Sequence, residues 1–183
     1  MAVAISEKRL SLREFLELEE RYPERRFKPA ANGAIIEMSP SRSHGFIEGW
    51  IYRLLQNWLE TEHLSGFGAG VEITHDLDGW LCVPDVAVLP LEGEDYPREA
   101  PLLAVEIESR SNTRPELRAK AARYLERGTQ VVWLVYPESR SLELHRAGES
   151  AQTLSAGDVL EGGATLPGFR VSVDEIFPPA RQG

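Results

Sequence analysis

Apolar side chains recur every three or four residues across residues 47–58, and this is the clearest helix pattern in the chain. The spacing puts them on one face of an α-helix, which should pack against a sheet. Two further helices are indicated where a serine or threonine stands three residues before a glutamate, the spacing of a capping box. These helices begin at Ser11 and Thr113, and they should end near Tyr22 and just before Gly128.

Short runs rich in apolar residues predict the strands. The run at 131–136 is almost wholly apolar, as a central strand buried on both faces should be. The run at 142–146 alternates apolar and polar residues, which favours an antiparallel strand at the edge of a sheet. The Asp-Gly pair Asp78-Gly79 predicts a hairpin turn between two neighbouring strands. The predicted strands cover residues 34–38, 71–75, 80–89, 102–108, 131–136 and 142–146.

The order of these elements predicts an α/β fold with a mixed central sheet flanked by helices. A chain of 183 residues is long enough for one continuous core but short for two, so we expect a single domain over residues 1–183. Within it we expect an N-terminal helix and strand in residues 1–39 and a core region in residues 40–137. A C-terminal β extension in residues 138–183 should add an antiparallel portion to the fold.

Charge bears on nucleic-acid binding. The chain has 20 Lys and Arg residues against 29 Asp and Glu residues, so its net charge is -9. Because phosphate backbones are bound through Lys and Arg, such a chain must concentrate its positive charge locally or use a bound metal ion. The charge of the whole chain therefore argues against strong nonspecific affinity for DNA.

Features that the sequence lacks bear on its location. No apolar stretch approaches the ~20 residues needed to span a bilayer, so no membrane association is expected. The single cysteine, Cys82, can form no disulfide within the chain, which suits a reducing compartment. We therefore expect a cytoplasmic protein.

Carboxylates in apolar strand segments are the first candidates for chemistry. Glu106 and Glu108 are two residues apart in the predicted strand 102–108, so their side chains share one face. Like charges this close repel, and burial adds several kcal/mol per ion, a cost that a bound cation would offset. Asp85 interrupts another apolar strand and could converge with Glu106. Hard ions such as magnesium or manganese take oxygen ligands and keep several waters. Two carboxylates, those of Asp85 and Glu106, together with the main-chain carbonyl of Ile107 would therefore suffice to bind such an ion.

A lysine on the following helix could complete the site. Lys120 lies between Leu117 and Tyr124 on the flank of the apolar face of this helix, from which its ammonium group could reach back over the sheet. Near a metal ion it would hold a water molecule or stabilise charge on a phosphate. Two simpler accounts stay open: a salt bridge between Glu106 and Lys120 without any metal, or a helical pair of Lys120 with Glu116.

Four short segments, taken in order, carry a family resemblance. They are Pro84-Asp85, Val105-Glu106-Ile107-Glu108-Ser109, Lys120 with Tyr124, and Trp133-Leu134-Val135-Tyr136-Pro137. In this order and spacing they resemble the Uma-type restriction endonuclease family, which is itself similar to the PD-(D/E)XK nucleases. The resemblance covers the chain from about residue 40 to residue 137. It implies a restriction-endonuclease-like fold, with residues 40–137 as its nuclease-like core.

The resemblance implies a role for each matching residue. Asp85 and Glu106 would bind the metal ion, and Lys120 would be the catalytic lysine, displaced from the strand onto the helix. Glu108 stands where the standard pattern has its lysine, and it is a candidate third metal ligand. The departures from the family pattern are Ser109-Arg110-Ser111, Glu116 and Val131-Val132.

Residues outside the central three could support the site. His44 is similar to a histidine that the family shows before its long helix, and Glu48 follows it by one helical turn. The simpler interpretations are a packed or helix-start histidine and a solvated acid. Tyr124 follows Lys120 by one turn and could also contribute. If DNA is the ligand, the local basic patch would be Arg110, Arg114 and Arg118, together with Lys120.

The first hypothesis is therefore a metal-dependent endonuclease that hydrolyses DNA phosphodiester bonds with magnesium or manganese. Asp85 and Glu106 would hold the ion that polarises the phosphate and activates water, and Lys120 would orient that water. Two alternatives stay open. One is a noncatalytic or degenerate nuclease fold that binds a protein or effector, and the other is a metal-dependent hydrolase of a small phosphorylated substrate. A homodimer would suit double-strand cutting of DNA.

Overall fold

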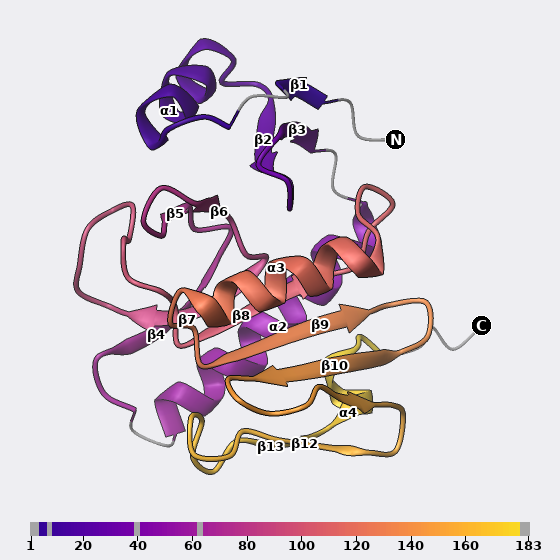
Figure 1. Ribbon diagram of the computed structural model, residues 1–183. Helices are drawn as coiled ribbons and strands as arrows, with labels where there is room; N and C mark the ends of the chain where they lie inside the picture. The colour runs from indigo at the N-terminus through magenta and orange to yellow at the C-terminus, as the bar shows by residue number, and fades with distance from the viewer. Residues whose placement is uncertain (1–3, 7–8, 39–40, 62–63, 180–183) are drawn as a thin grey trace.

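The central feature of the computed structural model is a six-stranded mixed sheet with helices on both faces (Figure 1). The structure describes residues 4–6, 9–38, 41–61 and 64–179. The strands of the sheet are β4 (Phe67–Val71), β7 (Val86–Pro90), β8 (Leu103–Ile107), β9 (Val131–Tyr136), β10 (Ser141–Arg146) and β11 (Gln152–Leu154). Their order is β11-β10-β9-β8-β7-β4, and within this sheet only β8 and β9 run parallel. The predicted α/β fold with a mixed central sheet is confirmed.

Helices cover the two faces of this sheet separately. The helices of the described chain are α1 (Leu12–Arg21), α2 (Arg42–Thr61), α3 (Arg114–Glu126) and α4 (Val173–Ile176). On one face α2 and α4 share a large apolar core with Val105 and Ile107 of β8. On the other face α3 packs against Ala104 of β8 and Leu134 of β9. Because strand side chains alternate, Glu106 shares the α3 face with Ala104, as the sequence predicts.

The three helices predicted from the sequence are confirmed. Both capping boxes are present, with Ser11 capping α1 and Thr113 capping α3. The last turn of α1 is capped by Tyr22, and α3 stops before Gly128, whose φ of 106° suits glycine and ends the helix. The apolar stripe of residues 47–58 lies within α2 and faces the core. As the crossover between β8 and β9, α3 allows these two strands to run parallel.

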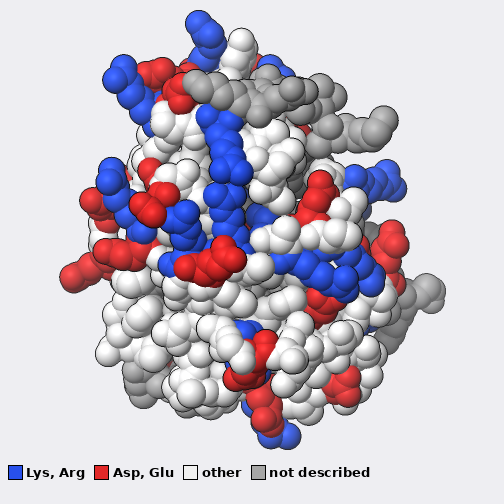
Figure 2. All heavy atoms as spheres, viewed as in Figure 1, with Lys and Arg blue, Asp and Glu red and all other residues white. Residues whose placement is uncertain are grey.

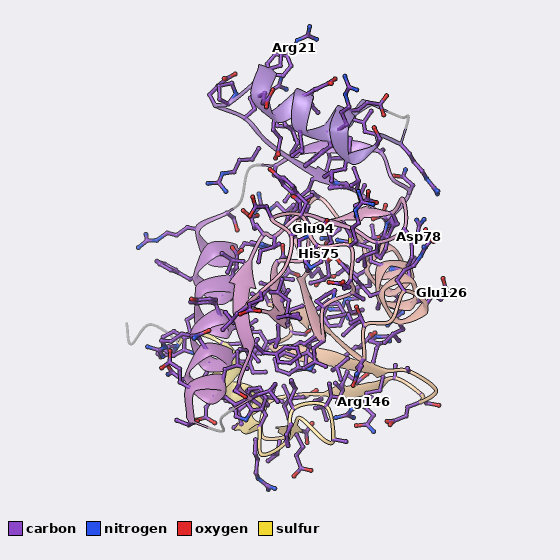
Figure 3. The ribbon with its side chains drawn as sticks, turned by 90° about the vertical axis from the view of Figure 1, so that its left-hand side faces the viewer. Arg21, His75, Asp78, Glu94, Glu126 and Arg146 are labelled. Carbon is purple, nitrogen blue, oxygen red and sulfur yellow. The ribbon has the colours of Figure 1, made fainter. Side chains whose placement is uncertain are left out.

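The first elements of the chain form an N-terminal unit, made of α1 and a small antiparallel sheet. Its strands are β1 (Ala4–Ser6), β2 (Arg26–Pro29) and β3 (Ile35–Met38), in the order β1-β3-β2. The predicted strand 34–38 corresponds to β3, whereas β2 was not predicted. Phe15, Phe27 and Ile35 pack with Leu81 into a separate apolar cluster. Figures 1 and 3 both place this unit at one end of the molecule, with Arg21 at its outer tip (Figure 3).

The predicted continuous strands at residues 71–75 and 80–89 are wrong. Residues 67–71 form β4, and a separate two-stranded hairpin follows, made of β5 (His75–Asp76) and β6 (Leu81–Cys82). Its turn is the predicted one, because Asp78 and Gly79 both have positive φ values of 54° and 75°. The strand then breaks between β6 and β7 at Pro84, which has no amide hydrogen to donate to a ladder. Directly after this break Asp85 rejoins the sheet, with its N–H donating to the carbonyl of Val105 and its carbonyl accepting from the N–H of Glu72.

The C-terminal part of the chain is antiparallel, as predicted, but β10 is not an edge strand. β11 pairs with its outer side and takes the edge position. The strands β12 (Val159–Glu161) and β13 (Arg170–Ser172) form a further hairpin. The alternation in residues 142–146 reports only what packs against the two faces of the strand. It gives no information on whether another strand pairs with its free edge, which is why the edge prediction failed. No helix in the described part of the chain is long and apolar enough to cross a membrane.

Candidate active site

Asp85 lies between β6 and β7 and is only 3% exposed. Its backbone N–H donates to the carbonyl of Val105 at 3.0 Å, and its Oδ2 accepts a hydrogen bond from the N–H of Ile107 at 2.7 Å. These two bonds hold the carboxylate against β8. The other oxygen, Oδ1, accepts a hydrogen bond from Lys28 Nζ at 2.5 Å and lies 3.5 Å from His44 Nε2.

Asp85 and Lys28 form a buried ion pair. Burial alone would raise the pKa of Asp85, but the charge of Lys28 and the hydrogen bond with His44 hold it well below its ordinary value. For Lys28, burial alone would lower the pKa, but the charges of Asp85 and Glu106 raise it above its ordinary value. Each group thus stabilises the charged form of the other, and both are ionised at neutral pH.

Glu106 is the second buried carboxylate, also 3% exposed. From β8 it faces α3, where Lys120 Nζ forms an ion pair with Glu106 Oε1. The hydroxyl of Tyr124, one helical turn further on, donates to the same oxygen at 3.0 Å. Burial raises the pKa of Glu106, and the charge of Asp85 adds to this effect against the opposing charge of Lys120. The ammonium group of Lys120 therefore does reach back over the sheet.

More acidic groups lie on the α2 side of Asp85. Burial, together with the charges of Glu72 and Asp85, raises the pKa of Glu48 to about 7. Glu72 follows β4 with a φ of 49°, a left-handed conformation that costs a residue with a side chain about 1–3 kcal/mol. Its Oε1 lies 3.4 Å from Lys28 Nζ. His44 thus lies 3.5 Å from Asp85 and lines the pocket, whereas Glu48 is not among the lining residues and is affected by Asp85 only through its charge.

Lys28, Asp85, Glu106 and Lys120 line one small pocket of about 50 Å³. The pocket lies between the N-terminal unit, the end of β8 and the first half of α3. Its volume accommodates a few water molecules or a hydrated ion, and it is far too small for a nucleotide. A larger substrate could therefore present only one group, such as a phosphate, to these four side chains.

The donor atoms suit a hard divalent ion that keeps several of its waters. Asp85, Glu106 and Ile107 all line the pocket, and magnesium is commonly held by one or two carboxylates together with water. Across the described ranges, no three His, Cys, Asp or Glu side chains are grouped so that they could hold a metal ion. The expected third ligand is not in place, because Glu108 lies beyond the end of β8 and pairs with Arg114 at 3.1 Å.

The arginines predicted as a DNA-binding patch lie along the start of α3 and the turn before it. Figure 2 shows Lys and Arg gathered around the level of α3, interleaved with Asp and Glu. Arg114 stacks on the ring of Tyr136, 4.2 Å from its centroid, in addition to its pair with Glu108. Arg118 donates to Glu143 through both Nη2 and Nε, at 2.6 and 3.0 Å. Two of the three arginines thus have acidic partners, whereas Arg110 is exposed.

The pair of Arg118 with Glu143 predicts an acid-sensitive contribution to stability. Hydrogen bonds from Arg118 lower the pKa of Glu143 from 4.5 to about 2. A carboxylate with a lowered pKa stabilises the fold above its unfolded pKa, and this stability is lost as the pH falls through the folded pKa. We expect Arg118→Gln to flatten the fall in unfolding free energy between pH 4.5 and 2, measured by urea denaturation. Parallel curves for the two proteins would contradict this.

Sequence reasoning missed two members of the site, Lys28 and Glu72. Lys28 stands between Phe27 and Pro29, so it is a charged residue in a short apolar run, the same signal that marked Asp85. That signal could have been used, but β2 itself was not predicted. Glu72 carries no comparable signal, because its position depends on a backbone conformation that its side chain does not favour.

Comparison with known proteins assigns the sequence of this chain to a family. The model of the Uma2 family, described as "Putative restriction endonuclease", matches residues 12–174. The fold is similar to the crystal structure of "a putative nuclease belonging to DUF820" from Anabaena variabilis, with a TM-score of 0.78. That match has 18% sequence identity and covers 92% of this chain and 97% of the other. At this identity the likeness shows the fold alone. Comparison with curated proteins found no match.

Proposed function

The chain belongs to the Uma2 family of restriction-endonuclease type, and from this premise we propose that it is a metal-dependent endonuclease that hydrolyses DNA phosphodiester bonds. One observation carries the proposal: two buried carboxylates and two buried lysines line one small pocket at the end of β8. Burial of two such pairs carries a desolvation cost for each ion, and clusters of buried charged groups in a pocket are typical of functional sites. A pocket of this size also suits a single phosphate group.

Each residue of the proposed site has a separate task. Asp85 and Glu106 would hold magnesium or manganese, which when bound polarises the scissile phosphate and lowers the pKa of the attacking water. Tyr124 orients Glu106 through its hydroxyl, and the N–H of Ile107 orients Asp85. Lys120 would position the water or stabilise the charge that develops on the phosphate.

The predicted basic patch would position the DNA backbone. Three arginines, Arg110, Arg114 and Arg118, lie at the start of α3 or just before it, in the same stretch of chain as Ser109, Ser111 and Asn112 of the pocket wall. We expect charge reversal at Arg110 and Arg114 to weaken DNA binding and to lower its dependence on salt, by about one unit of log–log slope for each phosphate that is no longer neutralised. Binding is measured by fluorescence anisotropy at several salt concentrations. Unchanged affinity and slope would remove the patch from the proposal.

A noncatalytic role is the second candidate, and one observation favours it. Each carboxylate of the pocket is already paired with a lysine, Asp85 with Lys28 and Glu106 with Lys120. A pocket that is neutralised by its own side chains can persist as a structural or ligand-binding element in a protein that no longer cleaves DNA.

Nicking of supercoiled plasmid by the purified protein separates the two functions. The protein is incubated with magnesium, with manganese and with a chelating agent, at several ionic strengths. Conversion to open-circular DNA that requires metal supports the endonuclease. Absence of nicking with either metal, by folded protein that binds the same plasmid, would support the noncatalytic role. A homodimer, as double-strand cutting suggests, is tested by light scattering with and without DNA.

A further inference from the structure

Lys28 is the most unusual charged residue of the described chain outside the family pattern. It is 7% exposed and reaches the pocket from β2 of the N-terminal unit. Fifty-seven residues separate it from Asp85, whose carboxylate it binds at 2.5 Å. A buried lysine is costly to desolvate and is retained only where its charge has a partner. Lys28 therefore links the N-terminal unit electrostatically to the carboxylates of the central sheet.

A second carboxylate is within reach of the same ammonium group. Glu72 Oε1 lies 3.4 Å from Lys28 Nζ, and the Glu72 side chain is 27% exposed, so it is better hydrated than Asp85. The N–H of Glu72 donates to the carbonyl of Asp85 at 3.2 Å, which ties the two acids together. A lysine that leaves Asp85 thus has an anionic partner next to it, at the border of the pocket.

The charges in the pocket bear directly on metal binding. Asp85 and Glu106 carry two negative charges, and Lys28 and Lys120 carry two positive charges at hydrogen-bonding distance from them. A divalent ion that approaches Asp85 meets the ammonium group of Lys28 on the same oxygen, Oδ1. Two cations this close repel strongly in a poorly solvated site. The lysine and the metal ion therefore compete for one ligand atom.

We propose that Lys28 is an internal counter-cation, which a divalent ion must displace from Asp85 and which Glu72, already 3.4 Å away, then retains. This rests on the proposed metal site, and it means that the N-terminal unit, through Lys28, controls the binding of the metal ion there. In the metal-free protein Lys28 holds the Asp85 carboxylate in place through its hydrogen bond to Oδ1. With metal bound, its ammonium group stays at the border of the pocket, where it faces an incoming phosphate.

Calorimetric titration of Mn²⁺ into the metal-free protein tests the competition directly. Lys28→Met keeps the length and the apolar stem of the side chain but removes the charge. We expect this variant to bind Mn²⁺ at least about tenfold more tightly than the parent protein, because one repelling charge next to the ion is lost. Glu72→Gln should bind Mn²⁺ several-fold more weakly than the parent, because the displaced lysine loses its second partner.

Arg13→Met is the matched control for the loss of charge. Arg13 lies on α1 of the same N-terminal unit and pairs with Glu17 at 2.8 Å, but its side chain is 88% exposed. We expect its Mn²⁺ affinity to stay within about twofold of the parent value, since water screens an exposed charge. If Lys28→Met does not fold, as judged by circular dichroism, Lys28→Gln removes the charge and keeps a hydrogen-bond donor.

The outcomes separate this inference from the proposed function. Equal Mn²⁺ affinity of the parent and the charge-neutral Lys28 variant overturns the inference, even where the protein nicks plasmid in a metal-dependent way. If the Lys28→Met variant binds Mn²⁺ more tightly and the Glu72→Gln variant more weakly than the parent, but no protein nicks plasmid, the inference is supported and the proposed endonuclease activity is ruled out. Failure of the parent and of all variants to bind Mn²⁺ overturns both.

Discussion

Replacing Asp85 with asparagine is expected to reduce metal-dependent nicking of plasmid DNA by about 10²-fold or more, because a bound metal ion supplies several kcal/mol of transition-state stabilisation. Asparagine has nearly the shape of aspartate, and its amide oxygen can still accept the hydrogen bond from the N–H of Ile107. The variant loses the charge that a divalent ion would bind. Nicking rates of parent and variant are compared at equal protein concentration.

Asp78→Asn is the matched control for this substitution. Asp78 also carries an ion pair, with Arg127 at 2.6 Å, but its side chain is 94% exposed and it lies in the β5–β6 turn (Figure 3). Its nicking rate should equal that of the parent. Calorimetry with Mn²⁺ adds a second measurement, in which Asp85→Asn should bind the ion weakly or not at all. A folded Asp85→Asn variant that nicks at the parent rate would remove Asp85 from the site.

Replacing Lys120 with methionine should lower the free energy of unfolding at neutral pH by about 3–5 kcal/mol, since it leaves a buried carboxylate without its counter-charge. Glu106 is 3% exposed, and in this variant its Oε1 would keep the hydrogen bond from the hydroxyl of Tyr124 but no ion pair with α3. The pKa of Glu106 is already raised by burial, so the variant should regain stability as the pH falls and Glu106 takes up a proton. Urea denaturation followed by circular dichroism measures both effects.

The size of this loss decides between two accounts of Lys120 that the sequence leaves open. A helical pair with Glu116 would contribute only about 0.2–0.5 kcal/mol. The structure instead has Glu116 in the capping box of α3, where it accepts hydrogen bonds from Thr113. The double variant Glu106→Gln with Lys120→Met removes both charges and should recover most of the lost stability. A single variant as stable as the parent would mean that the buried pair contributes nothing.

Much of the fold could be predicted from local patterns. The stripe in residues 47–58 and the two capping boxes predicted the three long helices, because helical spacing and caps are properties of neighbouring residues. The apolar run at 131–136 predicted a central strand for the same reason. Strand prediction was wrong between residues 71 and 89, where the chain breaks at Pro84. Pro84 marks this break in the sequence, but the apolar residues on either side of Pro84 and Asp85 favoured one continuous strand.

What the sequence determined by itself was the set of groups that one strand and the next helix bring together. Side-chain alternation placed Glu106 on the α3 face, and helical spacing placed Lys120 and Tyr124 on the side of α3 that reaches it. Only the tertiary structure decided the rest of the pocket. Lys28 meets Asp85 because the N-terminal unit packs over the end of β8, and Glu108 turns to Arg114 because β8 ends before it. Interactions between distant segments depend on how whole elements pack, and no local spacing encodes them.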